Sequence, residues 1–404
     1  MRCSCVFLAI SSSLPLSSFS SHANANTIER SENNFVFNLK EGNHFDANIE
    51  AKYGYIDNFL NQSSNEKSTT FAKLSANAFM QTHNDHQLLQ LDAKLDALTF
   101  NDFDEDDHSN VALKAKYFYK LSDMQTVFVS ALLTNSYEYR GTGASKGNAL
   151  SLNSGDEFDD TLINTGYNYG RYDSVSKVSL LVGIKEREYK TRKQQTQSLN
   201  NEAKFAHVGL DYLLSGKTYF SVLAEFEDID YDYATDQNRK EIAILAGVKW
   251  EASQVSQLTL MLGYESLSFD QSVFDDDDIF KWRMSYDWTP LDYFSMQFKS
   301  GRSSEQSNEL ARNYRVVDDY TIASVYSMNS YIKVNLNVTY RSEETNFTDI
   351  TVVEDNLTFG PQLQYQISDR VKMHVGYDFT SVKSDININE YDKNSFEVGI
   401  NGQF

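Results

Sequence analysis

The chain ends in KNSFEVGINGQF (393–404), a stretch in which apolar and polar side chains alternate. Phe396 and Val398 share one parity, whereas Glu397 and Asn401 share the other. Successive side chains of a β-strand point to opposite faces, so this stretch predicts a strand with one apolar face. That face needs a covering layer, and the rest of the chain decides whether protein or lipid supplies it.

The same alternation recurs from residue 45 to the end of the chain. Segments with this period-two pattern include 47–55, 89–97, 111–119, 178–184, 242–250, 258–264, 332–340 and 371–379. Most are about ten residues long, the length that a tilted strand needs to cross a bilayer. Beyond the first 25 residues, no segment approaches the roughly 18 consecutive apolar residues of a transmembrane helix.

The connections between these segments alternate in length. Short ones are 82–86, 121–125, 214–217, 289–292 and 367–370, and long polar ones are 57–68, 101–109, 140–160, 188–201, 228–238, 269–278, 303–315, 342–355 and 382–392. Short turns at one end and long loops at the other are typical of bacterial outer-membrane barrels. We therefore predict an all-β fold, a closed antiparallel transmembrane β-barrel of about 18 strands over residues 45–404.

A soluble all-β fold is the alternative to a membrane barrel. A sandwich would bury its apolar faces in a shared core and would need turns rich in Pro and Gly, but the chain contains only 3 Pro. A repeat solenoid would show a tighter sequence period. We therefore expect outer-membrane lipid to cover the apolar faces, and the last strand to pair with the first, because an open edge leaves backbone groups unsatisfied in hydrocarbon.

The beginning of the chain predicts export. Residues 1–25 combine one Arg, a short apolar stretch, a Ser-rich region and small residues at Ala23 and Ala25, which is the pattern of a cleaved signal peptide. Cys3 and Cys5 would leave with it, so the mature chain would have no thiol for disulfides, metals or catalysis. Residues 26–44 are predicted to form a periplasmic segment before the barrel.

The overall charge limits the partners. A net charge of −21 argues against nucleic acid, which needs a basic surface. The acidity lies in long loops such as 102–107, 155–160 and 275–278, which we interpret as solvated surface or as sites where divalent cations bridge to lipopolysaccharide.

The polar parity of the strands carries many basic residues that we predict to line the lumen. They are Lys94, Lys114, Lys116, Lys185, Arg187, Lys249, Lys281, Arg283, Lys299, Lys333 and Lys372. These residues could form ion pairs that support the wall, or they could favour anions in a water-filled passage. The long loop 140–160 contains Gly141, Gly143 and Gly147, which would let it fold inward as a constriction.

No catalytic, metal or cofactor site is predicted. The motif HNDH (83–86) lies in a short turn and lacks further ligands at suitable spacing. His374 lies beside Asp378 without a paired Ser, so an acyl-transfer site is not supported. We therefore do not expect an enzyme.

The second half of the chain resembles the putative beta-barrel porin 2 family. The resemblance rests on GVKWEASQVSQLTLMLGYESLSFD (247–270), FKWRMSYDWTP (280–290), YFSMQFKSGRSS (293–304) and DRVKMHVGYDF (369–379). The first half matches only in its alternation of strands with short and long connections. It implies an outer-membrane barrel associated with exopolysaccharide machinery and supplies no catalytic residues. The terminal Phe404 similarly resembles the signal by which bacterial outer-membrane barrels are recognised for insertion.

Together with the barrel that the alternation predicts, this resemblance implies a conduit that exports an exopolysaccharide or capsule-type polymer across the bacterial outer membrane. The expected partners are outer-membrane lipid, lipopolysaccharide, the polysaccharide and periplasmic export proteins. Two alternatives stay open: a general diffusion porin for small solutes, and a non-conducting adhesin or structural barrel.

Overall fold

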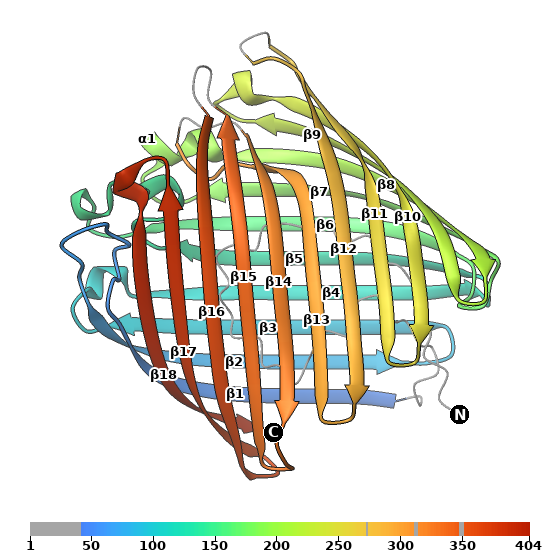
Figure 1. Ribbon diagram of the computed structural model, residues 1–404, viewed down its shortest axis with the longest axis horizontal. Coiled ribbons are helices and arrows are strands. Elements are labelled where there is room, and N and C mark those ends of the chain that lie inside the picture. Colours follow the sequence, from blue (N-terminus) through green and yellow to red (C-terminus); the bar gives the residue numbers. More distant parts are fainter. Residues whose placement is uncertain (1–41, 272–273, 311–313, 347–350) are drawn as a thin grey trace.

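The computed structural model describes residues 42–271, 274–310, 314–346 and 351–404, which form one 18-stranded sheet (Figure 1). The strands are β1 (Gly42–Ile56), β2 (Thr69–His83), β3 (Gln87–Phe100), β4 (His108–Ser122), β5 (Gln125–Glu138), β6 (Asp156–Tyr169), β7 (Ser176–Tyr189), β8 (Asn201–Ser215), β9 (Thr218–Tyr231), β10 (Arg239–Ser253), β11 (Ser256–Phe269), β12 (Asp277–Leu291), β13 (Phe294–Gln306), β14 (Tyr314–Ser327), β15 (Ile332–Asn346), β16 (Thr351–Ser368), β17 (Val371–Ser384) and β18 (Tyr391–Gln403). Within these ranges the connections carry one short helix, α1 (Lys193–Thr196), and 3-10 turns at Asp104–Asp106, Gly143–Ser145, Ala149–Ser151, Gln197–Leu199, Thr235–Gln237 and Asn387–Asn389. No helix in the described ranges is long and apolar enough to cross a membrane.

The sheet closes on itself. Each strand pairs with its sequence neighbours in antiparallel fashion, and β1 also pairs with β18 from Asn48↔Gln403 to Ile56↔Ser395. One residue past β18, the Phe404 N–H donates to the Ala47 carbonyl at 2.8 Å. The predicted closed antiparallel barrel of about 18 strands is confirmed.

The two faces of the wall differ as the alternation predicts. On β10, Ile242 and Ile244 point outward and are 53% and 62% exposed, whereas Ala243 and Leu245 point inward and are fully buried. Large apolar side chains recur at outward positions on the other strands. Lipid is therefore the layer that covers these side chains in an outer-membrane barrel.

Turns and loops separate to opposite ends of the barrel, and the C-terminus lies at the end with the short turns (Figure 1). The first strand begins at Gly42, which is earlier than the predicted boundary at residue 45. Residues 42–44 pair with β2, and they are Gly, Asn and His, so an analysis of apolar alternation did not detect this extension. The predicted signal peptide (1–25) and residues 26–41 of the predicted periplasmic segment lie outside the described residues.

The interior is not uniformly polar. Leu181, Phe205, Leu223, Ala243, Leu245 and Met261 form a buried cluster on the inner faces of β7–β11, with Phe128 and Leu162 packed against it. Apolar side chains therefore fill part of the lumen on this side, while the inner faces of β14–β17 carry mainly polar residues.

The wall overlaps itself at one place near the loop end. The β12–β13 ladder stops at Trp282↔Arg302, although both strands continue. Beyond that point the Ser304 N–H donates to the Glu265 carboxylate at 3.0 Å, and the Ser304 hydroxyl donates to Glu241 at 3.1 Å. Val316, which pairs with Ser304, packs in one cluster with Leu267. The ends of β13 and β14 thus lie against the inner faces of β10 and β11, where carboxylates replace the missing ladder partners.

We expect a charge on the outward face to destabilise the barrel, whereas the same charge facing the lumen is tolerated. Leu262 points outward near the middle of β11 and is 46% exposed, so Leu262→Arg should lower the free energy of unfolding by about 2–4 kcal/mol in lipid. The matched control is Asn337→Arg, at an exposed inward position of β15. Urea unfolding in phospholipid vesicles measures both, and equal losses would contradict the assigned faces.

Candidate functional site: the lumen and its mouth

A long connection crosses the loop end of the barrel. Residues 139–155 join β5 to β6, and we call them the strap. Lys146 of the strap contacts Glu309, between β13 and β14, at 2.8 Å and Glu354 of β16 at 2.5 Å. Because β5 and β14 lie on opposite sides of an 18-stranded ring, these ion pairs reach across the mouth.

Apolar contacts hold the strap at both ends of its crossing. Ala149 packs in a cluster with Phe59 and Leu60 of the β1–β2 connection. Ala144 packs in another cluster with Tyr189 and Leu310. The strap is therefore a packed part of the mouth, and the inward fold predicted for this loop occurs at the mouth of the lumen.

Two glycines let the strap approach its neighbours closely. Gly141 has φ +80°, and a Cβ there would lie 2.3 Å from the Leu60 carbonyl oxygen. Gly143 has φ +47°, and a Cβ there would lie 2.0 Å from the Glu138 carboxylate. A side chain at Gly141 would collide with the Leu60 backbone, and one at Gly143 would displace the Glu138 carboxylate from a position where the positive φ already disfavours L residues.

A single buried carboxylate fixes both ends of the strap. Asp106 is fully buried and accepts hydrogen bonds from Arg140 Nε at 2.9 Å and from the Tyr137 hydroxyl at 2.6 Å. The Gly155 N–H, at the other end of the strap, donates to the same carboxylate at 3.2 Å. Asp106 belongs to an acidic run that the sequence presented as solvated loop or as a cation bridge, and this interpretation is wrong for Asp106.

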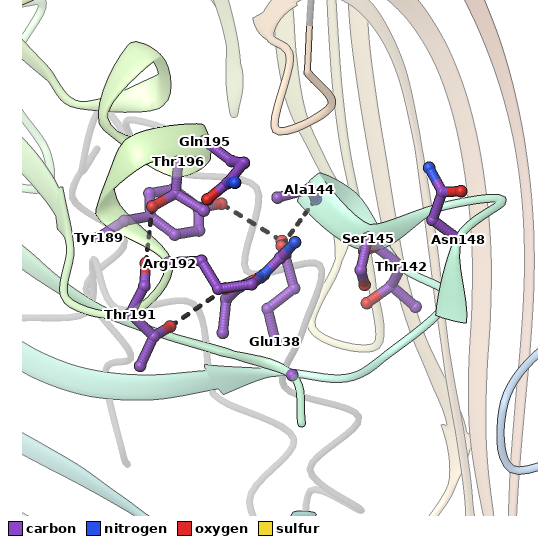
Figure 2. A network of polar contacts seen from close by, with 12 residues as sticks. Glu138, Thr142, Ala144, Ser145, Asn148, Tyr189, Thr191, Arg192, Gln195 and Thr196 are labelled. Carbon is purple, nitrogen blue, oxygen red and sulfur yellow. Dashed lines mark hydrogen bonds and ion pairs between the residues drawn. The ribbon is translucent and has the colours of Figure 1, made fainter. Parts of the chain in front are cut away.

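A second buried carboxylate, Glu138, lies directly beneath the strap (Figure 2). It accepts hydrogen bonds from the Ala144 N–H at 2.9 Å, the Asn308 amide at 2.9 Å and the Tyr189 hydroxyl at 3.4 Å. Each of these donors belongs to a different part of the mouth. Glu138 thus joins the strap to β7 and to the β13–β14 connection.

Burial changes the protonation of Glu138. The outward face of β5 becomes polar at Asn135, whose amide donates to Asp159 at 2.8 Å, so Glu138 lies beyond the apolar band. The pKa of the Glu138 carboxyl is raised to about 7, chiefly by removal from water and to a lesser extent by Asp156, although Ala144, Asn308 and Arg187 oppose the rise. This group therefore titrates near neutral pH.

The structure places the predicted lumen residues on the inward face of their strands, and several of them form ion pairs with acidic residues. The pairs are Lys94–Asp96 at 3.1 Å, Lys185–Glu227 at 2.5 Å, Arg187–Asp160 at 2.7 Å, Lys249–Asp211 at 2.7 Å, Lys281–Glu265 at 2.6 Å and Arg283–Glu225 at 3.2 Å. Lys114 lies opposite Asp92, and Lys116 lies opposite Gln90. The arrangement matches the supporting role more closely than a continuous basic lining.

Lys299, Lys333 and Lys372 lie on the other, polar side of the lumen. Lys299 is exposed opposite Thr321, Lys333 lies opposite Gln364, and Lys372 lies opposite Gln366. The residues around them carry hydroxyls and amides. One row crosses four strands as Thr321, Thr339, Thr358 and Thr380, and another group contains Asn335, Asn337, Gln362 and Gln364.

The comparisons with known proteins agree with this architecture. The sequence pattern of the putative beta-barrel porin 2 family matches residues 44–404. The chain belongs to this family. The match extends over the first half, where the sequence alone had shown only the rhythm of the family, and it places the barrel in the bacterial outer membrane.

Solved structures match this family member at low similarity. The siderophore receptor PirA from Acinetobacter baumannii has 8% identity and a TM-score of 0.47, with 91% of this chain and 81% of that chain covered. OpdQ from Pseudomonas aeruginosa has 10% identity and a TM-score of 0.47, with 90% of this chain and 99% of that chain covered. Among curated proteins no match was found.

The described residues of this porin-family barrel include no group of three or more His, Cys, Asp or Glu side chains placed to hold a metal ion. In HNDH (83–86), the Asn84 side chain accepts hydrogen bonds from the N–H groups of His86 and Gln87, both at 2.9 Å. This motif therefore stabilises a tight turn. Phe404 is 69% exposed at the end of β18, and its role as an insertion signal stays a prediction.

We expect Lys146→Ala to loosen the strap. The substitution leaves Glu309 and Glu354 without their shared cation, at a cost of about 2 kcal/mol, which corresponds to a roughly 30-fold higher ratio of open to closed strap. Single-channel recordings in planar bilayers should show longer or larger openings. Lys193→Ala, at the exposed first residue of α1, is the matched control. Identical recordings for the two variants would contradict the role of the Lys146 ion pairs in keeping the strap closed.

We also expect the strap to close more firmly as the pH falls. The pKa of Glu138 is about 7 with the strap in place and returns toward its ordinary 4.5 if opening exposes the carboxyl to water. Closure is thus favoured by up to about 3 kcal/mol below pH 4.5, and this contribution is lost as the pH rises through 7.

Channel recordings between pH 4.5 and 8.5 test this dependence on Glu138. Glu138→Gln should remove most of it, because the amide cannot titrate. Glu157→Gln, at an exposed position on β6, should leave it unchanged. A pH response that survives in Glu138→Gln would assign the effect to another group.

Proposed function

We propose that this barrel is a gated conduit that exports an exopolysaccharide or capsule-type polymer across the outer membrane. The observation that carries the proposal is the inner face of β14–β17, where threonine hydroxyls and Asn and Gln amides recur on neighbouring strands. Such neutral groups exchange hydrogen bonds with sugar hydroxyls at little net cost. A conduit requires weak, repeated contacts of this kind, because it must release what it binds.

The strap supports the gated form of this proposal. A polymer pore with an open mouth would leak small solutes whenever polymer is absent. The strap is held across the mouth by ion pairs and hydrogen bonds at Lys146 and Glu138, which a polymer arriving through the lumen can exchange for its own. The short turns at the opposite end would face the periplasm, where export proteins could dock.

Secretion by a deletion strain tests the proposal. Removal of the gene should leave polymer in the periplasm, and expression of the intact chain should return it to the surface. Normal surface polysaccharide in the deletion strain would overturn the export role. A point variant that retains folding but fills the polar wall, such as Asn337→Trp, should reduce secretion, because Asn337 is exposed on the inner face of β15.

General diffusion of small solutes is the second candidate, and membership of a porin family favours it. Conductance separates the two. A steady open current without polymer supports diffusion, whereas a mostly closed channel that opens when the strap is loosened supports export. A third candidate is a non-conducting adhesin or structural barrel. It predicts no current whether or not the strap is loosened, and loss of surface binding when the exposed acidic loops are removed.

A further inference from the structure

The wall of the barrel has a step at the loop end of β12. This strand pairs with β11 as far as Asp277, but its ladder with β13 ends at Trp282↔Arg302. Beyond that pair β13 bends away from β12 (Figure 1), and the Ser304 N–H donates to Glu265 of β11. A carboxylate thus replaces the lost ladder for β13. The end of β12, by contrast, has no ladder partner on its β13 side within the described part of the chain.

The unpaired backbone groups of β12 belong to Asp278 and Phe280. Alternate residues of a strand direct their N–H and C=O groups to the same side. The Ser304 N–H points away from β14, and Arg302 shares its direction, so Arg302 bonds to Trp282 across the ladder. On β12, Phe280 and Asp278 share the direction of Trp282 and therefore face the step. Lipid cannot bond to these groups, so they need a polar partner.

A cleft lies beside this strand edge on the outward side of the wall. Its volume is about 480 Å³, within the roughly 300–1,000 Å³ of small-molecule sites. Residues of β12 line one part of it, and Arg302, Asp318, Tyr320 and Glu344 from β13–β15 line another. The ring centroids of Trp282 and Tyr320 are 5.8 Å apart. An open strand edge next to side chains of this kind is the geometry that binds an extended peptide by strand addition.

The side chains of the cleft favour a basic ligand. Four carboxylates line it, those of Asp277, Asp278, Asp318 and Glu344, together with the guanidinium of Arg302. Arg302 is paired with Asp318 at 2.6 Å and lies 4.0 Å from Glu344, whose side chain is 45% exposed. The aromatic rings also attract Lys and Arg side chains. A basic peptide therefore complements the cleft directly, whereas a phosphate would need additional cations.

We propose that this cleft binds an extended, basic segment of a partner protein at the cell exterior. The segment adds to β12 as a further strand, so that its backbone bonds to Asp278 and Phe280. Its Lys or Arg side chains contact the carboxylates of Asp278 and Glu344. The loop end faces the exterior in outer-membrane barrels, so the partner is an extracellular or surface protein. This interaction is separate from export, because it uses the outward side of the wall.

Binding of a labelled peptide tests the strand addition. The probe is fluorescein-labelled (Lys-Thr)₃, and fluorescence anisotropy measures its Kd for the intact barrel in phospholipid nanodiscs without lipopolysaccharide. Phe280→Pro removes one N–H of the open edge and should weaken binding about tenfold, while proline at an edge position leaves the barrel folded. Phe280→Ala is the matched control, because it removes the ring and keeps the N–H. Equal Kd values for these two variants would overturn the proposal.

A second comparison tests the charge of the cleft. Asp278→Asn/Glu344→Gln should weaken binding of the peptide about tenfold, and (Glu-Thr)₃ should not bind. Glu186→Gln/Glu202→Gln removes the same charge from outward positions of β7 and β8 and should leave the Kd unchanged. Equal weakening in both double variants would overturn the site. So would Mg²⁺-dependent binding of lipopolysaccharide that Asp278→Asn/Glu344→Gln abolishes, if the peptide does not bind.

Discussion

The structure depends on satisfying every backbone N–H and C=O group in a wall that lipid surrounds. Water cannot serve as a partner in hydrocarbon, so an edge strand would carry a row of unsatisfied groups. Pairing of β1 with β18 removes that edge, and the contact between Ala47 and Phe404 extends the closure to the last residue. Where the β12–β13 ladder ends early, the Ser304 N–H finds the Glu265 carboxylate instead. The overlap of the wall is thus compatible with closure because buried side chains replace the lost ladder.

The same demand extends to the charges inside the barrel. Ionised groups withdrawn from water need partners, and the ion pairs on the inner face of β6–β12 supply them. At the mouth these pairs also join segments that are distant in sequence, since Lys146 connects the strap to carboxylates beyond β13. Ion pairs of the same kind therefore support the barrel wall and close its mouth. The consequence is that the closed mouth is sensitive to any change that neutralises one partner.

The sequence predicted the fold well because a barrel repeats one local rule. Alternation, strand length and the asymmetry of turns and loops are all local properties, and they suffice to identify an outer-membrane barrel of about 18 strands. The site was harder to predict from the sequence, because it depends on contacts between strands on opposite sides of the barrel. Nothing near Asp106 in the sequence reveals that it meets Arg140 and Gly155, and the apolar inward residues Leu223 and Leu245 break the expected polar lining. The glycines of the strap were the one local signal that pointed to the mouth.

The uneven lumen gives the proposed path a direction. Apolar packing on β7–β11 fills one side, so a hydrophilic chain would travel along β14–β17. The neutral wall can let such a chain slide, and the carboxylates of Glu309 and Glu354 at the mouth repel a polyanion at the exit unless Lys146 stays between them. A polyanion that reaches the mouth competes with these carboxylates for Lys146, and each ion pair that it replaces weakens the hold of the strap on the mouth. Opening of the mouth would then follow from the charge of the polymer itself.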